Sequence, residues 1–246
     1  MSDSRATSFG AAADDYEAAR PEYPFEAVAW MLETLAHRSR RIADVGAGTG
    51  KLTRVLADAP QAEVVAVDPD AAMLAKLRET VPGVPTFVGS AEALPLPDAS
   101  LDAVVLGQAW HWVDPASASA EVGRVLRPGG TLGLIWNTRD NRVDWVRRLT
   151  EVMSSSVAEE MIDAGGPTVA APFDAVQSER WEWLRPMTRA QLHRMAASRS
   201  HWITASDETR EAVRQGMDAL FDELGLAGDA TIDVPYVTSA FRAQRG

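Results

Sequence analysis

The chain has 246 residues, 46% of them apolar, which is enough for a single α/β domain with its own core. Its net charge of −11, with no basic patch to offset it, makes nucleic acid a poor partner. The chain has no Cys, its four His lack the spacing of a helical metal site, and no apolar run is long enough for a membrane span. We therefore expect a cytoplasmic protein without a bound metal or a membrane partner.

Strand signals alternate with helix signals over residues 25–138. Apolar residues at helical spacing predict a first helix over 25–36. The strands expected next are 42–45, 63–67, 86–88, 102–106 and 131–136, and the helices between them are 51–57, 70–80 and 117–126. This alternation predicts a parallel sheet with helices on both faces, and such sheets bind ligands beyond the carboxyl ends of their strands.

The pattern changes after the fifth expected strand. Apolar spacing predicts a helix over 141–163, and Thr188 with Gln191 predicts a capping box that opens a later helix. The other expected elements are a helix over 213–224 and strands over 181–184 and 232–237.

A glycine-rich segment, Asp44-Val45-Gly46-Ala47-Gly48-Thr49-Gly50, ends the first expected strand and precedes a helix. Its glycines tolerate positive φ and let a ligand approach the backbone closely. The free N–H groups at the start of the helix attract an anion. The segment therefore predicts a binding site for a ligand with an anionic group.

The second expected strand ends at Asp68. A carboxylate at this position can accept two hydrogen bonds from the hydroxyls of a ribose. Asp68 could instead cap the helix that follows. Both interpretations remain open at this stage.

Five segments between residues 41 and 136 resemble class I S-adenosylmethionine-dependent methyltransferases, in the same order. They are DVGAGTG (44–50), VDPD with Met73 (67–73), GSAE (89–92), LPLPD (94–98) and LRPGG (126–130). The chain looks closest to the branch that includes trans-aconitate methyltransferases and quinone-biosynthesis methyltransferases. The resemblance implies an α/β fold with a Rossmann-like, doubly wound sheet of seven strands, the last antiparallel. It also implies an N-terminal lid segment, a helical insertion after the fifth strand and S-adenosylmethionine as the methyl donor.

The resemblance further implies roles for individual residues. Asp44 and the Gly46–Gly50 loop hold the methionine end of the donor, Asp68 binds the ribose hydroxyls and Met73 lies against the adenine. The complete set of implied cofactor-binding residues is Asp44, Gly46, Ala47, Gly48, Gly50, Asp68, Pro69, Met73, Ser90, Ala91 and Gln108. Ser90 stands where the family usually has Asp, so the backbone N–H of Ala91 is an alternative contact to the adenine. Met73 could equally be a core residue.

The methyl acceptor is expected beyond the fourth and fifth strands. Trp110 follows the fourth strand and can form a flat wall. The adjacent His111 can hydrogen-bond the acceptor or act as a catalytic base. Tyr16 and Arg20, in the expected lid, complete the substrate-binding set. The alternative is that His111 holds the loop in place and that Trp110 and Trp112 are packing residues.

These features predict a single methyltransferase domain, 1–246. Residues 1–24 form the lid, residues 25–138 bind the cofactor and residues 139–246 build the acceptor pocket from helices and the final strands. We expect methyl transfer to a small-molecule acceptor, at a carboxylate or hydroxyl oxygen, by in-line displacement. Two other hypotheses remain: a nicotinamide-dependent dehydrogenase, whose G-x-G-x-x-G pattern differs by one position from this loop, and a non-catalytic S-adenosylmethionine-binding protein. The sequence predicts no oligomeric state.

Overall fold

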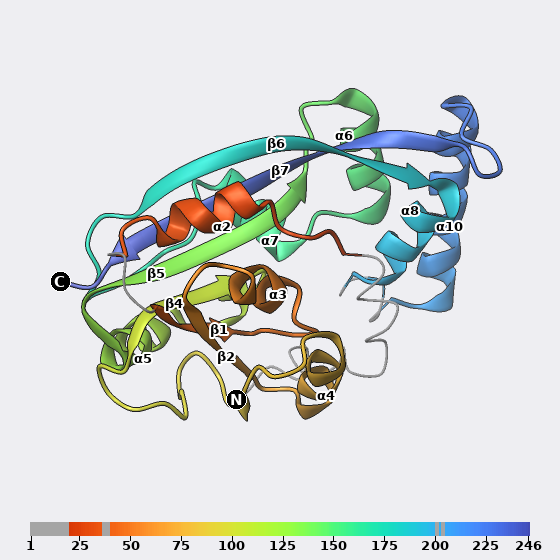
Figure 1. Ribbon diagram of the computed structural model, residues 1–246. Helices are drawn as coiled ribbons and strands as arrows, with labels where there is room; N and C mark the ends of the chain where they lie inside the picture. Colours follow the sequence, from red (N-terminus) through yellow and green to blue (C-terminus); the bar gives the residue numbers. More distant parts are fainter. Residues whose placement is uncertain (1–19, 36–39, 200–201, 203–204) are drawn as a thin grey trace.

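The computed structural model describes residues 20–35, 40–199, 202 and 205–246, which contain a seven-stranded sheet (Figure 1). The strands are β1 (Arg40–Val45), β2 (Ala62–Asp68), β3 (Thr86–Val88), β4 (Leu101–Gly107), β5 (Leu126–Arg139), β6 (Gln177–Thr188) and β7 (Thr231–Gln244). Their order is β3-β2-β1-β4-β5-β7-β6. Strands β1 to β5 are parallel, and β7 is antiparallel to both β5 and β6. The expected seven-stranded sheet with an antiparallel last strand is confirmed.

Helices cover both faces of the sheet because its central strands are apolar on both sides. The helices of the first half are α2 (Phe25–Leu32), α3 (Lys51–Ala57), α4 (Ala71–Thr80) and α5 (Pro115–Val125). On β4, Ala103 and Val105 share a core with α2 and α3. The alternate residues Val104 and Leu106 share the opposite core with α5. Burial on both faces explains why β4 is a continuous apolar run in the sequence.

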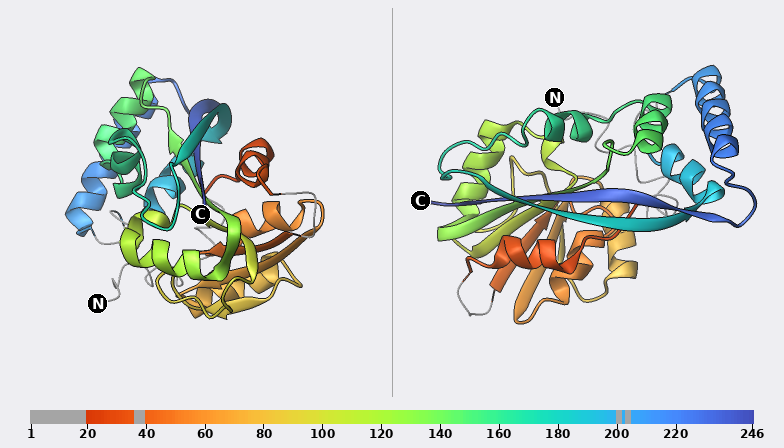
Figure 2. Two further views of the ribbon diagram at one scale, coloured as in Figure 1. Left: turned by 90° about the vertical axis from the view of Figure 1, so that its left-hand side faces the viewer. Right: turned by 90° about the horizontal axis from the view of Figure 1, so that it is seen from above.

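Long strands β6 and β7 carry a helical cluster at one end (Figures 1 and 2). Helices α6 (Asp144–Met153) and α7 (Val157–Asp163) follow β5, whereas α8 (Arg189–Ala197) and α10 (Asp207–Glu223) lie between β6 and β7. Side chains of α6, α8 and α10 form a third core, which includes Met217 and Phe221. The helical insertion expected after the fifth strand is therefore present. No helix within the described ranges is both long and apolar enough to cross a membrane.

The helix expected over 141–163 is interrupted. α6 ends at Met153, and the next residue, Ser154, has a φ of 66°, which a helix does not tolerate. Ser156 then opens α7 through a capping box with Glu159, each side chain bonding the other residue's backbone N–H. The capping box expected at Thr188 and Gln191 is confirmed at the start of α8.

Candidate cofactor and acceptor site

The glycine loop lies where the carboxyl ends of β1, β2, β4 and β5 meet. Gly46, Gly48 and Gly50 have φ values of 69°, 54° and 95°. A β-carbon at Gly46 would lie 2.6 Å from Cβ of Ala109, and one at Gly50 would lie 2.9 Å from Cγ of Leu77. At Gly48, a β-carbon would meet no atom of the described residues within 4 Å. Gly46 and Gly50 therefore permit close packing, whereas Gly48 borders a space that a ligand can enter.

Asp44 is fully buried at the end of β1. Its Oδ2 accepts a hydrogen bond of 2.6 Å from the Thr53 hydroxyl, whereas Oδ1 finds no donor among the described residues. Burial raises the pKa of Asp44 to about 7; the bond from Thr53 opposes this shift, and the charge of Asp68 adds to it. A buried oxygen without a donor is costly, so Oδ1 fits a ligand that brings a cationic N–H group. The ammonium group of S-adenosylmethionine is such a donor.

Asp68 ends β2 and uses both carboxylate oxygens to fix the loop. Oδ2 accepts from the backbone N–H of Gly48, and Oδ1 accepts from that of Asp70, both at 2.8 Å. Burial raises the pKa of Asp68 to about 6, against the opposing effect of these two bonds. The cap of α4 is Asp70, whose side chain accepts from Ala72 and Met73. The hypothesis that Asp68 itself caps this helix is therefore wrong.

The residues expected around an adenine lie on the same edge of the sheet. The backbone N–H of Gly89 donates to the carbonyl of Asp68, which brings Ser90 and Ala91 beside the end of β2. Ala91 is buried, and Met73 is buried in the first turn of α4. Pro69 and Ser90 are partly exposed. The structure thus brings these four residues to one side of Asp68.

Gln108 and Asn137 connect the ends of β4 and β5 to the segment before α2. Gln108, at a φ of 55°, donates from Nε2 to the carbonyl of Asn137 at 2.8 Å. Asn137 donates from Nδ2 to the carbonyl of Glu22 at 3.0 Å. The next residue, Tyr23, lies over the end of β4, since a β-carbon at Gly107 would be 2.7 Å from its hydroxyl. These bonds hold the segment that follows Arg20 across the carboxyl edge of the sheet.

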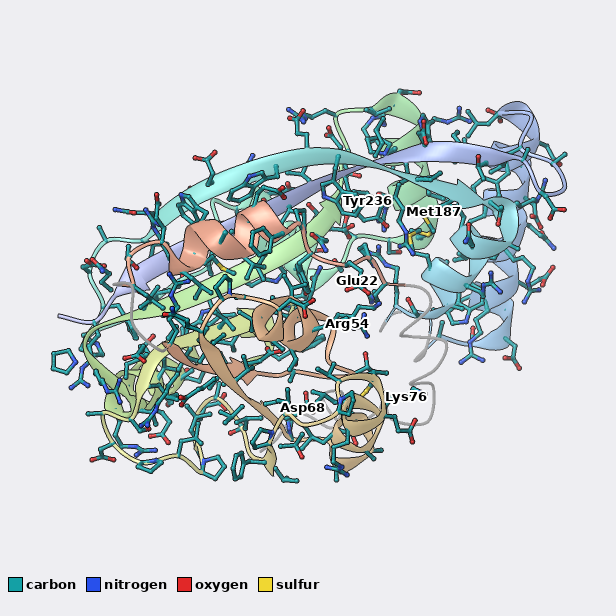
Figure 3. All side chains as sticks on the ribbon, viewed as in Figure 1. Glu22, Arg54, Asp68, Lys76, Met187 and Tyr236 are labelled. Carbon is teal, nitrogen blue, oxygen red and sulfur yellow. The ribbon has the colours of Figure 1, made fainter. Side chains whose placement is uncertain are left out.

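The side chain of Glu22 joins the same segment to the start of α3. Its Oε1 lies 3.1 Å from Nζ of Lys51 and 2.9 Å from a guanidinium nitrogen of Arg54. Figure 3 shows Glu22 beside Arg54. Lys51 directly follows the glycine loop. Tyr16, expected to bind substrate, lies outside the described residues, as does most of the expected lid over residues 1–24.

Trp110 is only 2% exposed and belongs to the core beneath α5. Its indole N–H donates to the carbonyl of Thr168 at 2.9 Å, which fixes the loop after β4. The expectation that Trp110 forms a wall facing the acceptor is wrong, because packing and this hydrogen bond direct the indole into the core. Trp110 instead supports the neighbouring residue, His111.

His111 accepts a hydrogen bond at Nδ1 in this structure. Its Nδ1 lies 3.3 Å from the indole nitrogen of Trp136, and an indole nitrogen can only donate. Nδ1 is therefore the acceptor and the ring proton lies on Nε2. Burial and, to a smaller extent, the positive charge of Arg20 lower the pKa of His111 to about 4. The only acceptor nitrogen of the neutral His111 ring, Nδ1, is already engaged, so it cannot take a proton from the acceptor as expected of a catalytic base. His111 can instead donate a hydrogen bond from Nε2.

Sequence reasoning assigned no individual role to Glu22 or to Asn137, which it placed only at the end of the fifth strand. Their partners lie at positions remote in the sequence, and no local pattern marks them. Within the described ranges, no group of three or more His, Asp or Glu side chains could hold a metal ion. A sheet of this order, with a glycine loop after β1 and a buried carboxylate at the end of β2, defines a Rossmann-like nucleoside-binding fold.

Comparisons with known proteins define the class further. A family model described as a methyltransferase domain matches residues 43–134. The chain is 45% identical over 245 residues to an uncharacterized methyltransferase of Mycobacterium tuberculosis, covering 96% of this chain and 95% of that relative. It is 30% identical over 211 residues to a malonyl-[acyl-carrier protein] O-methyltransferase of Enterobacter lignolyticus, covering 79% of this chain and 83% of that protein. A type II methyltransferase structure from Anaeromyxobacter dehalogenans is 26% identical and superposes with a TM-score of 0.64, covering 92% and 97% of the two chains.

The chain belongs to the class I S-adenosylmethionine-dependent methyltransferases, as its sequence motifs predict. It is an enzyme, and S-adenosylmethionine is its methyl donor. The hypothesis of a nicotinamide-dependent dehydrogenase is wrong, and so is that of a non-catalytic binding protein. The chemical class of the methyl acceptor has to be inferred from the geometry of the site.

Proposed function

We propose that the chain transfers the methyl group of S-adenosylmethionine to a carboxylate oxygen of a small molecule bound beyond β4 and β5. The observation that carries this proposal is the hydrogen bond from the Trp136 indole to Nδ1 of His111, which engages the lone pair of the neutral ring. A hydroxyl acceptor must lose a proton, which requires a base, whereas a carboxylate has already lost it. His111 offers an N–H donor and no free lone pair. The similar malonyl-[acyl-carrier protein] O-methyltransferase is named for transfer to oxygen, which supports an oxygen atom as the acceptor.

In this proposal, different residues at the carboxyl edge of the sheet bind different parts of the cofactor. Asp44 accepts hydrogen bonds from the ammonium group, and the N–H groups at the start of α3 hold the carboxylate. Asp68 binds the ribose hydroxyls with lone pairs that its two backbone donors leave unused. The loop and adenine side comprise Gly46, Ala47, Gly48, Gly50, Pro69, Met73, Ser90 and Ala91, and Gln108 closes the site toward β4.

S-adenosylmethionine, when bound, supplies an electrophilic methyl group. The protein's part is to position the acceptor and exclude water. His111 donates from Nε2 to one acceptor oxygen and so orients the other, whose lone pair forms the new C–O bond while the electrons of the C–S bond remain on sulfur. Arg20, whose charge acts on His111, completes the acceptor side. In this arrangement residues 25–138 hold the cofactor and residues 139–246 build the acceptor pocket of a single domain.

A labelled-donor experiment tests the proposal. Purified protein is incubated with S-adenosylmethionine that carries an isotopic label on the methyl group, together with fractions of a metabolite extract. A methyl ester releases its label as volatile methanol when treated with base, whereas ethers and methylamines retain it. Base-labile label together with S-adenosylhomocysteine is the expected result. Base-stable label would contradict carboxylate methylation.

A further inference from the structure

A buried group of charged side chains lies where β5, α7 and the end of α8 meet. Arg139, the last residue of β5, has a side chain only 4% exposed, and Glu159 of α7 and Arg199 are 7% and 8% exposed. The carboxylate of Glu159 accepts from both arginines, at 2.8 Å from Arg139 and 2.7 Å from Arg199. Two guanidinium groups thus share one carboxylate in the interior of the protein.

This group has unused capacity to bind an anion. Nε of Arg139 is buried and has no hydrogen-bond partner within the described part of the chain. Burial and, to a smaller extent, the charges of Arg199 and Arg20 lower the pKa of Arg139 to about 10, against the opposing charges of Glu159 and Tyr236. Arg139 and Arg199 hold the pKa of Glu159 near 2 against the opposing effect of burial, so the shared carboxylate is fully charged. A buried cationic excess in a chain of net charge −11 calls for an anionic ligand.

The group adjoins the acceptor side of the site. Arg139 ends β5, at the same sheet edge where β4 leads into His111. The charge of Arg20 acts on both Arg139 and His111, so Arg20 lies near both side chains. A small pocket also borders Arg199; its walls are Met153, Ala196, Trp202, Ala205, Thr209, Arg210 and Val213. Arg139 and His111 therefore lie near the same cationic side chain, on the acceptor side of the site.

We infer that Arg139 and Arg199 bind a second carboxylate of the acceptor, distinct from the one that is methylated, so that the acceptor is a small dicarboxylic acid. This inference rests on the proposed function. An acid group held by two guanidiniums has its oxygen lone pairs engaged and is a poor nucleophile, so the anchored group and the reacting group differ. The planar guanidinium forks match a carboxylate in shape. Glu159 positions the two forks by holding one nitrogen of each.

Binding to the unaltered protein provides the first test. Protein saturated with S-adenosylhomocysteine is titrated calorimetrically with malonate, succinate, glutarate and adipate, each beside its monoamide. We expect at least one diacid to bind ten times or more tightly than its monoamide, which keeps one carboxylate and loses the other. Equal binding of every diacid and its monoamide would overturn the inference. Inorganic phosphate is titrated in parallel, and tighter binding of phosphate than of every diacid would overturn the assignment to a carboxylate.

Variants then locate the binding group. Arg199→Gln should weaken the preferred diacid at least tenfold and leave S-adenosylhomocysteine affinity within twofold. Arg147→Gln, an exposed arginine of α6 paired with Asp144 and Glu151, is the matched control and should change neither. Unchanged diacid affinity in a folded Arg199→Gln protein would contradict the assignment. If that variant does not fold, Arg199→Lys keeps the charge but not the fork, and we expect it to lose part of the diacid preference.

The two proposals fail in different ways. If S-adenosylhomocysteine binds and a monoacid becomes a base-labile ester as readily as a diacid, the proposed function stands and the dicarboxylate inference is wrong. If the diacid binds as expected but the transferred label is stable to base, the anion site stands and carboxylate methylation is wrong.

Discussion

The substitution Asp44→Asn separates cofactor binding from folding. Asp44 is buried, and its Oδ2 accepts from Thr53 while Oδ1 has no donor within the described residues. Asn has the same shape and keeps one oxygen for the Thr53 hydroxyl, but its amide nitrogen replaces the other oxygen. An amide nitrogen cannot accept from an ammonium group. We therefore expect the variant to fold and to bind the methyl donor poorly.

Asp44→Asn should change both the affinity for the cofactor and the pH dependence of stability, and the size of each change can be worked out. A hydrogen bond to a charged group contributes about 1.5–3 kcal/mol, so S-adenosylhomocysteine affinity should fall roughly 10- to 150-fold. Burial raises the pKa of Asp44 from 3.8 to about 7. Because the folded pKa lies above the unfolded one, the stabilisation of the protonated carboxyl group is complete below about pH 4 and is lost as the pH rises to about 7. At 1.36 kcal/mol per pH unit, the loss in the apoprotein approaches about 4 kcal/mol.

Asn has no proton to lose, so Asp44→Asn should make the apoprotein more stable than the parent at pH 8 and not at pH 4. Urea unfolding of both proteins at the two pH values measures this difference, and calorimetry with S-adenosylhomocysteine measures the affinity. Asp58→Asn, at an exposed position after α3, is the control and should change neither quantity. A variant that binds S-adenosylhomocysteine normally, or that loses stability equally at both pH values, would refute the reasoning.

Three further substitutions test other parts of the site. Gly48→Val should abolish S-adenosylhomocysteine binding with a loss of about 1–2 kcal/mol in the free energy of unfolding, because its φ of 54° disfavours β-branched residues while no described atom lies within 4 Å of a β-carbon there. Normal binding would remove the loop from the site. His111→Gln should lower turnover without changing cofactor affinity. The shape of the pH–rate profile between pH 5.5 and 8 should also stay the same, since the pKa of His111 is about 4. Loss of an inflection near neutral pH in the variant would instead identify His111 as a base. Glu22→Gln should lower the free energy of unfolding by less than about 1 kcal/mol per lost ion pair, because the partners of Glu22 are partly exposed. It should also speed hydrogen exchange at residues 20–24. Unchanged exchange would show that other contacts hold this segment.

The core of the fold could be predicted because its signals are local. Strands β1 to β4 are short apolar runs, and the helices between the parallel strands have apolar faces at helical spacing. The fifth strand was expected at 131–136, whereas β5 has 14 residues. The later strands were expected to be short, at 181–184 and 232–237, whereas β6 and β7 have 12 and 14 residues. β6 lies at the edge of the sheet, and its many charged side chains face solvent. Its length therefore depends on its pairing with β7, and a short apolar run in the sequence does not reveal it. The break before α7 did have a local signal, Ser156 followed by Glu159.

The candidate site was predictable only in its cofactor half. The glycine loop and Asp68 lie next to strand ends, so their place follows from strand positions alone. The burial of Trp110 and the tautomer of His111 depend instead on Thr168 and Trp136, which lie at least 25 positions away. A sequence pattern identifies residue types that can do chemistry, but the direction of a ring and the place of its proton depend on such remote contacts.

The two halves of the proposed site carry opposite charges, and these charges affect how the substrates bind and how the products leave. Asp44 and Asp68 lie where the cationic donor is expected, and Arg139 and Arg199 lie where the anionic acceptor is expected. Each ligand is attracted by one half and repelled by the other, so the pair can bind in only one arrangement. Methyl transfer converts a sulfonium into a neutral sulfide and a carboxylate into a neutral ester. The carboxylate anchored by Arg139 and Arg199 and the ammonium group at Asp44 keep their charges, so each product is held by one charged group fewer than its substrate, which favours release once the methyl group has moved.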